Sequence, residues 1–268
     1  MNHPPSITKT VDWLIPFILV LLLSATSSCE KEDEKAKILI LFNHNVMDEP
    51  LQKDTMRYIN AAENLYEVNE LQYFISEVCF WTKGDKHILE SGKIVYIDID
   101  IPSTLEWMPE QKLPEGHYDS VTFVFGINQE KNKSGLFVNP PERDMFWPEM
   151  MGGGYHYMKM NGKWKTPGGS VEPFNLHLGI GMKMDSTGSK EFIHNYFTVS
   201  LPLNSCNLDH TKPINRFRLT MDINSWFESP NYWDWNVIGG QIMHNQNAMQ
   251  QASRNGWDAF SIHFDHTD

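Results

Sequence analysis

The sequence predicts an all-β domain: an antiparallel β-sandwich with long loops and a few short helices. Several short segments alternate apolar and polar residues, which is the pattern of strands that bury one face. Glycine, proline and asparagine separate these segments, and stretches with helical periodicity are short. The length suits one large β domain.

The predicted strands follow one another along most of the chain. They cover residues 38–46, 71–81, 94–101, 121–127, 157–164, 174–180, 196–203 and 217–223. The last segment shows the pattern most clearly, because every second residue from Phe217 to Ile223 is apolar. Asn161-Gly162 predicts a tight hairpin turn within 157–164, since this pair tolerates positive φ angles. Short helical turns are predicted near 54–63, 225–227 and 247–254, the last ended by Gly256.

Residues 1–28 predict a lipoprotein signal peptide. The apolar run from Leu14 to Leu23 is too short for a stable membrane anchor, and small residues precede Cys29. This arrangement resembles a bacterial lipobox with Cys29 as the lipidated first residue of the mature protein, although Thr26 stands where leucine is usual. We therefore expect an outer membrane lipoprotein that is periplasmic or surface-exposed and is held to the membrane by its lipid.

Residues 29–37 predict an acidic tether, and residues 38–268 the β-sandwich domain. The stretch from Glu30 to Lys35 contains no apolar residue, so it should stay solvated. Acidic residues directly after such a cysteine resemble the surface-export signal of Bacteroidetes-type lipoproteins. An ordinary solvated spacer explains them equally well.

The net charge of −12 argues against nucleic acid as a partner. Removing residues 1–28 takes away one Lys and one Asp, so the charge is unchanged on the remaining 240 of 268 residues. Phosphate backbones repel such a domain, and no Lys/Arg cluster offsets the repulsion. Cys79 and Cys206 could form a disulfide outside the cytoplasm, but no CxxC pair marks a thiolate metal site.

The sequence also lacks the common catalytic motifs. There is no GxSxG and no HExxH, and the run Gly152-Gly153-Gly154 is not followed by the GK[ST] of a phosphate loop. Paired carboxylates such as Glu142 and Asp144 are common in an acidic chain and do not indicate glycosidase chemistry. We therefore expect a protein that is not an enzyme.

An ordered series of motifs extends over nearly the whole mature chain. It comprises a first strand that reaches His44, then Tyr66–Ser76, Pro114–Tyr118, Asp144–Trp147 with Gly154-Tyr155, His177-Leu178-Gly179, Asp222–Phe227 and Phe260–His263. In this order the motifs resemble the MbnP-like family, the copper-binding proteins associated with methanobactin operons. Members of that family also occur as bacterial lipoproteins.

The resemblance implies a mononuclear copper site with histidine ligands, beside a tryptophan that a partner dihaem peroxidase oxidises to kynurenine. His44, His177 and His263 match the histidines, and Trp147 matches the tryptophan. The family often has a second tryptophan two residues further on, where this chain has Glu149. We therefore expect copper binding without oxidation of Trp147.

The chemistry of the three histidines supports this hypothesis, because neutral imidazole is a good copper ligand. Alternation places His44 on the buried face of its strand, whereas His177 and His263 are out of phase with their apolar neighbours. That mismatch suits a site at a sheet edge or beneath a loop. A lone histidine is more often a hydrogen-bonded or exposed residue, and nothing pairs the remaining histidines, His156 among them, at a ligand spacing.

The alternative is a glycan- or protein-binding surface without metal. Four tryptophans could form an aromatic platform for a sugar, or they could fill the core: Trp226, Trp233, Trp235 and Trp257. A sugar platform requires several of them to be exposed on one surface. Copper binding requires the ligating nitrogens of His44, His177 and His263 to lie about 3–4 Å apart, given bonds of about 2 Å.

Overall fold

The computed structural model describes residue 1 and residues 34–265, and residues 33–268 cluster as one unit. The predicted signal peptide, Cys29 and most of the tether lie outside the described residues. The end of the tether is folded: Lys35–Ala36 (β1) pairs with Leu113–Pro114 (β9), and Ala36 is fully buried. The domain therefore begins before Ile38. In the described part, no helix is long and apolar enough to cross a membrane.

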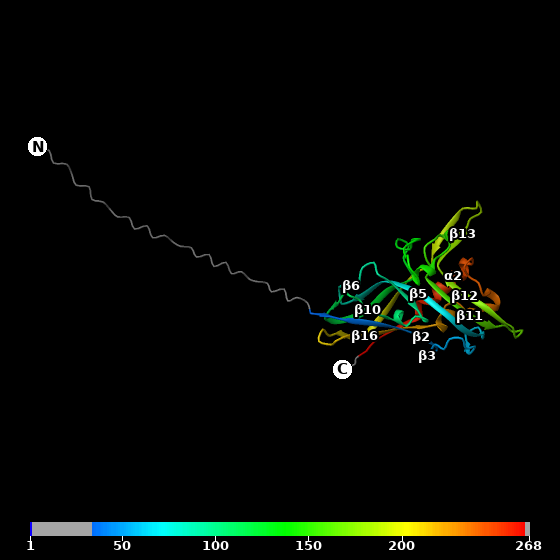
Figure 1. Ribbon diagram of the computed structural model, residues 1–268, viewed down its shortest axis with the longest axis horizontal. Helices are drawn as coiled ribbons and strands as arrows, with labels where there is room; N and C mark the ends of the chain where they lie inside the picture. Colours follow the sequence, from blue (N-terminus) through cyan, green and yellow to red (C-terminus); the bar gives the residue numbers. More distant parts are fainter. Residues whose placement is uncertain (2–33, 266–268) are drawn as a thin grey trace. The chain divides into compact units, whose positions relative to one another are not determined.

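The larger sheet is built around one long strand, Leu65–Trp81 (β5) (Figure 1). Its main path runs β12-β11-β5-β10-β15, with Val171–Leu178 (β12), Met158–Lys165 (β11), Gly116–Phe125 (β10) and Phe197–Leu208 (β15). Three shorter strands also pair with β5: Tyr58–Ile59 (β4), Lys86–Ile88 (β6) and Ile94–Asp98 (β7). All the pairs in this sheet are antiparallel.

The smaller sheet has the order β17-β16-β2-β3, with β8 also paired to β2. Its strands are Ile38–Val46 (β2), Glu49–Pro50 (β3), Glu106–Trp107 (β8), Asn215–Asp222 (β16) and Phe260–Phe264 (β17). Strands β2 and β16 run parallel, and the other pairs are antiparallel. Parallel pairing is possible because almost the whole sandwich lies between these two strands in the sequence, which provides a long crossover.

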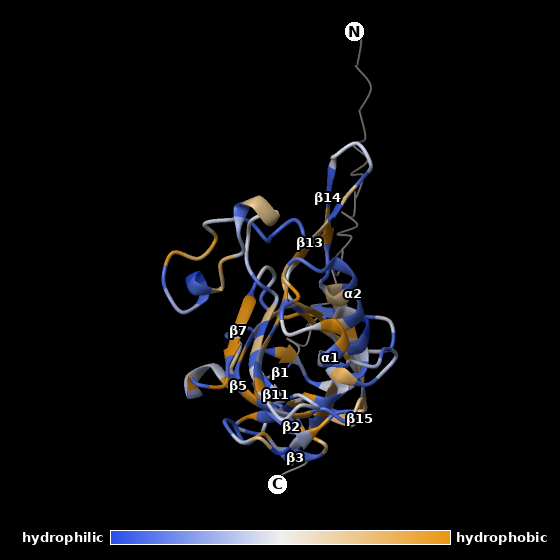
Figure 2. Cartoon of the chain, turned by 90° about the vertical axis from the view of Figure 1, so that its right-hand side faces the viewer, coloured by the Kyte–Doolittle hydropathy of each residue, from blue (hydrophilic) through white to orange (hydrophobic). Residues whose placement is uncertain are grey.

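A separate hairpin of Ile180–Met184 (β13) and Lys190–His194 (β14) projects from the sheets (Figure 1; Figure 2). The described helices are short. The α-helices are Trp235–Ile238 (α1) and Gln246–Asn255 (α2), and the 3-10 helices are Pro102–Thr104 (η1), Glu142–Met145 (η2), Glu149–Met151 (η3), Asn224–Phe227 (η4) and Gly256–Asp258 (η5).

Aromatic side chains fill the space between the two sheets. Phe80 on the larger sheet packs against Phe217 on the smaller one, with ring centroids 5.0 Å apart. Phe125 contacts Phe260 in the same way, at 5.5 Å. The alternation in β16 buries Phe217, Leu219 and Met221, and leaves Arg216 and Arg218 exposed. The predicted all-β sandwich with few short helices is confirmed.

Two local predictions are wrong. Asn161-Gly162 does not form a turn; it continues β11, with a register shift against β5 at this point. Glycine is needed there for close packing, because a Cβ on Gly162 would collide with the carbonyl of Glu67 and the ring of Phe174. The segment 54–63 forms β4 and turns rather than a helical turn. Helix α2 forms where it is predicted, and Gly256 is its C-cap.

Candidate metal centre

The structure separates the three histidines predicted from the sequence: one lies inside the sandwich, and the other two lie on the outer faces of the two sheets. His44 lies on β2 and points into the sandwich, where its Nε2 is 3.1 Å from the hydroxyl of Tyr73. His177 alternates with the buried Leu176 and Leu178 on β12, so it lies on the outer face of the larger sheet. The predicted phases of both side chains are confirmed.

His263 lies on the outer face of the smaller sheet. Its side chain is 64% exposed and sits 3.7 Å from Asp265. Across β16, His263 is opposite Arg218, whereas His44 is opposite Met221. His44 and His263 are therefore offset by three residues along the strands, which is about 10 Å, and by two strand spacings across the sheet, which is about another 10 Å. His44, His177 and His263 therefore do not converge, and the prediction of a site made by these three is corrected.

A different cluster forms where the segment 142–156 covers the outer face of the larger sheet. It contains Trp147, His156 and His177. The rings of Trp147 and His156 meet edge to face with centroids 4.6 Å apart, and the rings of His156 and His177 do the same at 5.1 Å. Of the predicted site residues, the structure thus brings together Trp147 and His177.

The glycine run explains how the covering segment folds back on itself. Gly152, Gly153 and Gly154 all have positive φ, which glycine adopts without strain. The backbone amide of Trp147 then donates to the carbonyl of Gly154 at 2.8 Å. Trp147 also packs against Gly179, where a Cβ would lie 2.7 Å from the indole ring. The motifs around Trp147, Gly154 and Gly179 are therefore parts of one structure.

His156 is held by the carbonyl of Met145. This oxygen accepts from the backbone amide of His156 at 2.7 Å and lies 2.9 Å from its Nδ1. A carbonyl can only accept, so Nδ1 carries the proton. In a neutral ring the lone pair then lies on Nε2, and that atom is buried without a hydrogen-bond partner.

His177 shows the mirror arrangement. Its Nε2 lies 2.8 Å from Oδ1 of Asn161, and the amide nitrogen of Asn161 donates to Glu70, which fixes which end of the amide faces the histidine. Nε2 of His177 therefore donates, and the lone pair lies on Nδ1, which is also buried and unpartnered. Metal-binding histidines typically donate their second ring nitrogen in this way.

Both imidazoles are neutral at physiological pH. Burial lowers the pKa of His156 to about 3, with a smaller contribution from its histidine neighbour, and burial lowers the pKa of His177 to about 4. The charge of Lys159, which lies directly across from His177 on β11, lowers both values further. The site thus presents two uncharged nitrogen lone pairs in a water-poor space, which suits a metal that binds imidazole.

Unpartnered side-chain nitrogens and oxygens are rare in the buried part of the described chain. Besides these two ring nitrogens, they are the indole nitrogens of Trp226 and Trp233. Indole N–H is a donor without a lone pair and cannot bind a metal. Within residues 34–265, one group of three possible ligands lies within metal-binding distance, Glu34, Glu115 and His210, but all three are exposed and His210 already contacts both carboxylates.

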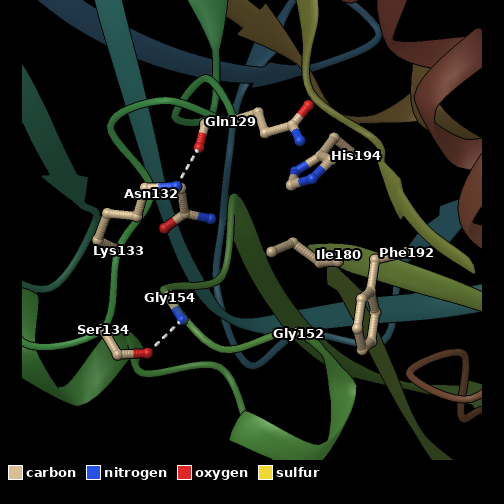
Figure 3. Close-up of a pocket in the computed structure, with 9 residues that line it drawn as sticks. All are labelled: Gln129, Asn132, Lys133, Ser134, Gly152, Gly154, Ile180, Phe192 and His194. Carbon is tan, nitrogen blue, oxygen red and sulfur yellow. Dashed lines mark hydrogen bonds between the residues drawn. The ribbon is translucent and has the colours of Figure 1, made fainter.

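A cavity of about 290 Å³ lies on the other side of the glycine run (Figure 3). Ile180 and Phe192 of the β13–β14 hairpin form its apolar side, and the backbone amide of Gly154 donates to Oγ of Ser134 at 2.8 Å. Figure 3 shows His194 beside Gln129 on the same side as Ile180 and Phe192, with Lys133 and Ser134 across the cavity. A Cβ on Gly152 would meet Ile180 at 2.8 Å, so this wall is closely packed.

The structure also bears on the proposed tryptophan platform and on the possible disulfide. Trp226, Trp233 and Trp235 are fully buried, and only Trp257 of the four candidate platform residues is exposed, so they fill the core. Cys79 and Cys206 are both buried free thiols.

Sequence reasoning missed His156 because it follows no strand pattern. The signal that could have found it is the pairing of 157–164 with 174–180. That pairing aligns Lys159 with His177, which places His156 three residues away and next to the segment carrying Trp147.

Comparison with known proteins identifies one family, by its sequence model and by a solved structure. The MbnP family model matches residues 35–249. Among solved structures, the chain is similar to MbnP from Methylosinus trichosporium, with 12% sequence identity and a TM-score of 0.55 over 86% of this chain and 99% of that one. At this identity the likeness shows the fold. No curated protein sequence matches the chain.

Proposed function

The chain belongs to the MbnP family, and from this premise we propose that it is a copper-binding protein whose ion is held by His156 and His177. The observation that carries the proposal is the pair of buried ring nitrogens, Nε2 of His156 and Nδ1 of His177, whose lone pairs have no partner. Leaving buried polar atoms unpaired costs about 1–3 kcal/mol each. A bound metal ion removes that cost.

Copper fits the donor set. Imidazole nitrogen is a borderline-soft ligand, and copper binds such sites more tightly than other divalent first-row ions. The second ring nitrogens are held by the Met145 carbonyl and by Asn161, so both ligands are oriented before the ion arrives. The protein's role is binding and orientation, and we propose no catalytic step.

Trp147 is the tryptophan that borders the proposed copper site. Its indole is fully buried against His156, and its Nε1 donates to the carbonyl of Met151 at 3.2 Å. An oxidising partner, such as the dihaem peroxidase implied by the family resemblance, cannot touch this ring directly. Because Glu149 replaces the second tryptophan, we propose that copper binds with Trp147 unmodified.

The localisation remains a proposal as well. We propose that the signal peptide is removed and that Cys29 is acylated, which would hold the domain at the outer membrane. Expression with the native signal in a Gram-negative host tests this: the protein should partition with membranes and carry acyl chains. A soluble, unacylated product would contradict the proposal, and Cys29→Ala is the matched control.

Copper analysis of the purified protein tests the metal site. The wild type should hold close to one copper ion per chain, and His156→Ala and His177→Ala should each lose most of it, because one remaining imidazole cannot replace the lost bond. His44→Ala and His263→Ala are matched controls and should keep their copper, since neither side chain belongs to the cluster.

Two results would count against the proposal. Loss of copper in His44→Ala with retention in His156→Ala would move the site into the sandwich. Absence of copper in folded wild-type protein would leave the metal-free alternative, a surface-binding β-sandwich. Peptide mass spectrometry of Trp147, after production with and without a dihaem peroxidase, separates copper binding from oxidation.

A further inference from the structure

A second histidine site lies at the edge of the smaller sheet, in a cavity of about 410 Å³ that no part of the copper proposal uses. Leu51, Ile99 and Leu105 form apolar walls, and His44 and Lys53 supply polar groups. Lys53 forms an ion pair with Asp100, and both side chains remain partly exposed. The cavity is therefore an apolar space with a few polar groups at defined places, which is the usual composition of a ligand pocket.

The tautomer of His44 follows from where the buried hydroxyl of Tyr73 can place its proton. Tyr73 is fully buried and its hydroxyl has one partner among the described residues, Nε2 of His44. The phenol keeps its proton, because burial raises the pKa of Tyr73 well above its usual range. If the hydroxyl is to donate, Nε2 must accept, and the proton of the neutral ring then lies on Nδ1.

The Nδ1–H of His44 opens onto the cavity. This atom makes no hydrogen bond within residues 34–265 and is not among the buried unpartnered atoms, so it reaches open space where His44 lines the pocket. Burial lowers the pKa of His44 to about 4, so the ring is a neutral donor at pH 7. It has no free lone pair for a metal.

The backbone of β2 adds a second donor beside it. On this edge the amide of Phe42 donates to Leu105 and the carbonyl of His44 accepts from Leu51, at 2.8 and 2.9 Å. Backbone groups of one residue point to the same side of a strand, so the carbonyl of Phe42 and the amide of His44 face the same gap. β8 pairs with β2 at Ile40 and Leu41 and β3 pairs at Asn45 and Val46, so no strand of the described structure pairs with β2 at this gap, and neither group makes a backbone hydrogen bond outside the strand pairs. The gap is bounded by Leu105 and Leu51, so no strand can run through it.

We propose that this cavity binds the carboxylate of an apolar amino-acid residue, either N-acylated and free or at the C-terminus of a peptide. The ligand carboxylate accepts from the amide and from Nδ1–H of His44, with the ammonium of Lys53 nearby. The ligand's own amide N–H donates to the carbonyl of Phe42. Its side chain occupies the space between Leu51, Ile99 and Leu105. Carboxylate capture by backbone and side-chain N–H groups is a known recognition mode, and bonds to a charged acceptor are the stronger ones.

Calorimetric or NMR titration with two probes tests the chemistry. N-acetyl-leucine should bind with a Kd of about 1 mM or tighter. N-acetyl-leucinamide has the same shape without the charge and should bind about tenfold weaker or worse. A peptide ending in free leucine distinguishes the sources: tighter binding than N-acetyl-leucine indicates a peptide C-terminus, and equal binding indicates that the cavity reads a single residue.

Variants test the geometry. His44→Phe keeps a ring of similar size and should reduce binding of N-acetyl-leucine at least about tenfold. Tyr73→Phe removes only the hydroxyl that fixes the tautomer and should have a smaller effect in the same direction. His263→Gln, on the outer face of the same sheet, is the control and should bind like the wild type. Circular dichroism and copper content report whether each variant is folded.

Three outcomes would overturn the proposal. They are no saturable binding of N-acetyl-leucine up to about 10 mM, equal binding of the acid and the amide, and unchanged binding by a folded His44→Phe variant. The copper proposal does not depend on any of them, because His177 lies on the larger sheet and His156 on the segment that covers its outer face.

Discussion

The cluster between the segment 142–156 and the larger sheet and the cavity beside β2 both contain buried histidines, but they use them in opposite ways. His156 and His177 each face an acceptor, so each donates its proton there and leaves a lone pair at the buried end. His44 faces the hydroxyl of Tyr73, which has no other acceptor among the described residues, so we infer that Nε2 accepts there and that Nδ1–H is presented to the cavity. All three rings are neutral because burial lowers their pKa values. The partner of the second ring nitrogen therefore decides whether a buried histidine suits a metal or an anion.

The largest effect expected from the three buried histidines is the pH dependence of the free energy of unfolding. The three folded-state pKa values lie at about 3 to 4, against 6.5 in the unfolded chain. Below pH 6.5 the unfolded chain binds protons that the folded protein excludes, so the free energy of unfolding falls. The loss is about 1.4 kcal/mol per pH unit for each histidine, or about 3 kcal/mol each by pH 4, and it levels off below the folded pKa.

Urea denaturation of the metal-free protein at pH 7, 6, 5 and 4.5 measures that loss. His44→Phe and His156→Phe should each flatten the pH dependence between 6.5 and 4 by about the contribution of one histidine. His263→Phe, which replaces an exposed ring, should leave the slope unchanged. Equal slopes in the wild type and in both buried variants would show that these rings are protonated in the folded protein.

The next effect concerns the packing of Trp147 alone. A Cβ on Gly179 would lie 2.7 Å from ring carbons of Trp147, so Gly179→Ala must displace the indole or the strand. We expect a destabilisation of about 1–3 kcal/mol together with weaker copper binding. Thermal unfolding and copper titration measure the two. Gly168→Ala is the control, because its Cβ meets nothing nearer than Thr166 at 3.8 Å. Ligand binding beside β2 should not change, and a change there would show that the two regions are coupled.

A more local change tests the tautomer of His177. Asn161→Ala removes the acceptor of its Nε2–H, so the ring can rotate or exchange tautomers. Copper affinity should fall by about 10- to 100-fold, the usual cost of removing such a partner. Asn175→Ala, on the same face of β12 two residues before His177, is the control. Competition titration with a copper chelator gives both values, and an unchanged affinity in Asn161→Ala would show that the neighbour does not orient the ring.

The sequence predicts the sandwich well because alternation records which face of a strand is buried. The segment 38–46 coincides with β2, and the phases of His44 and His177 are correct. Alternation says nothing about which outer face a loop will cover, so it could not pair His177 with His156. The same limit explains the failure with His263: the motif order resembled the family, but the outer face of the smaller sheet carries no covering segment at that position.

Local signals failed where tertiary contacts decide. Asn161-Gly162 has the composition of a tight turn, yet Gly162 is required by the closeness of Glu67 and Phe174, and the strand continues. The glycine run at 152–154 was visible in the sequence, but its role in folding Trp147 back toward His156 depends on positive φ angles at all three positions. The tautomers of His156 and His177 could not be read from the sequence, because each is set by a hydrogen-bond partner elsewhere in the chain.

The smallest predicted effect concerns which charge state of copper the site prefers. Lys159 lies across from His177 on β11 and donates to the carbonyl of Asp144 at 2.6 Å. Its charge lowers the pKa of both His156 and His177, which shows that it opposes positive charge on either ring. A bound metal ion feels the same repulsion, and Coulomb energy is proportional to the charge of the ion. The site should therefore favour monovalent over divalent copper.

Lys159→Met tests this last point, because it removes the charge and keeps most of the apolar stem. The affinity for divalent copper should rise several-fold, and the affinity for monovalent copper should rise by about the square root of that factor, since the repulsion is half as large. Lys163→Met on the same face of β11, where Lys163 pairs with Glu67, is the matched control and should change neither affinity. Competition titrations under reducing and oxidising conditions give the two values. An equal change for both ions would mean that Lys159 acts through packing rather than through charge. The two regions would then still differ in the tautomers of their histidines, but not through the charge of Lys159.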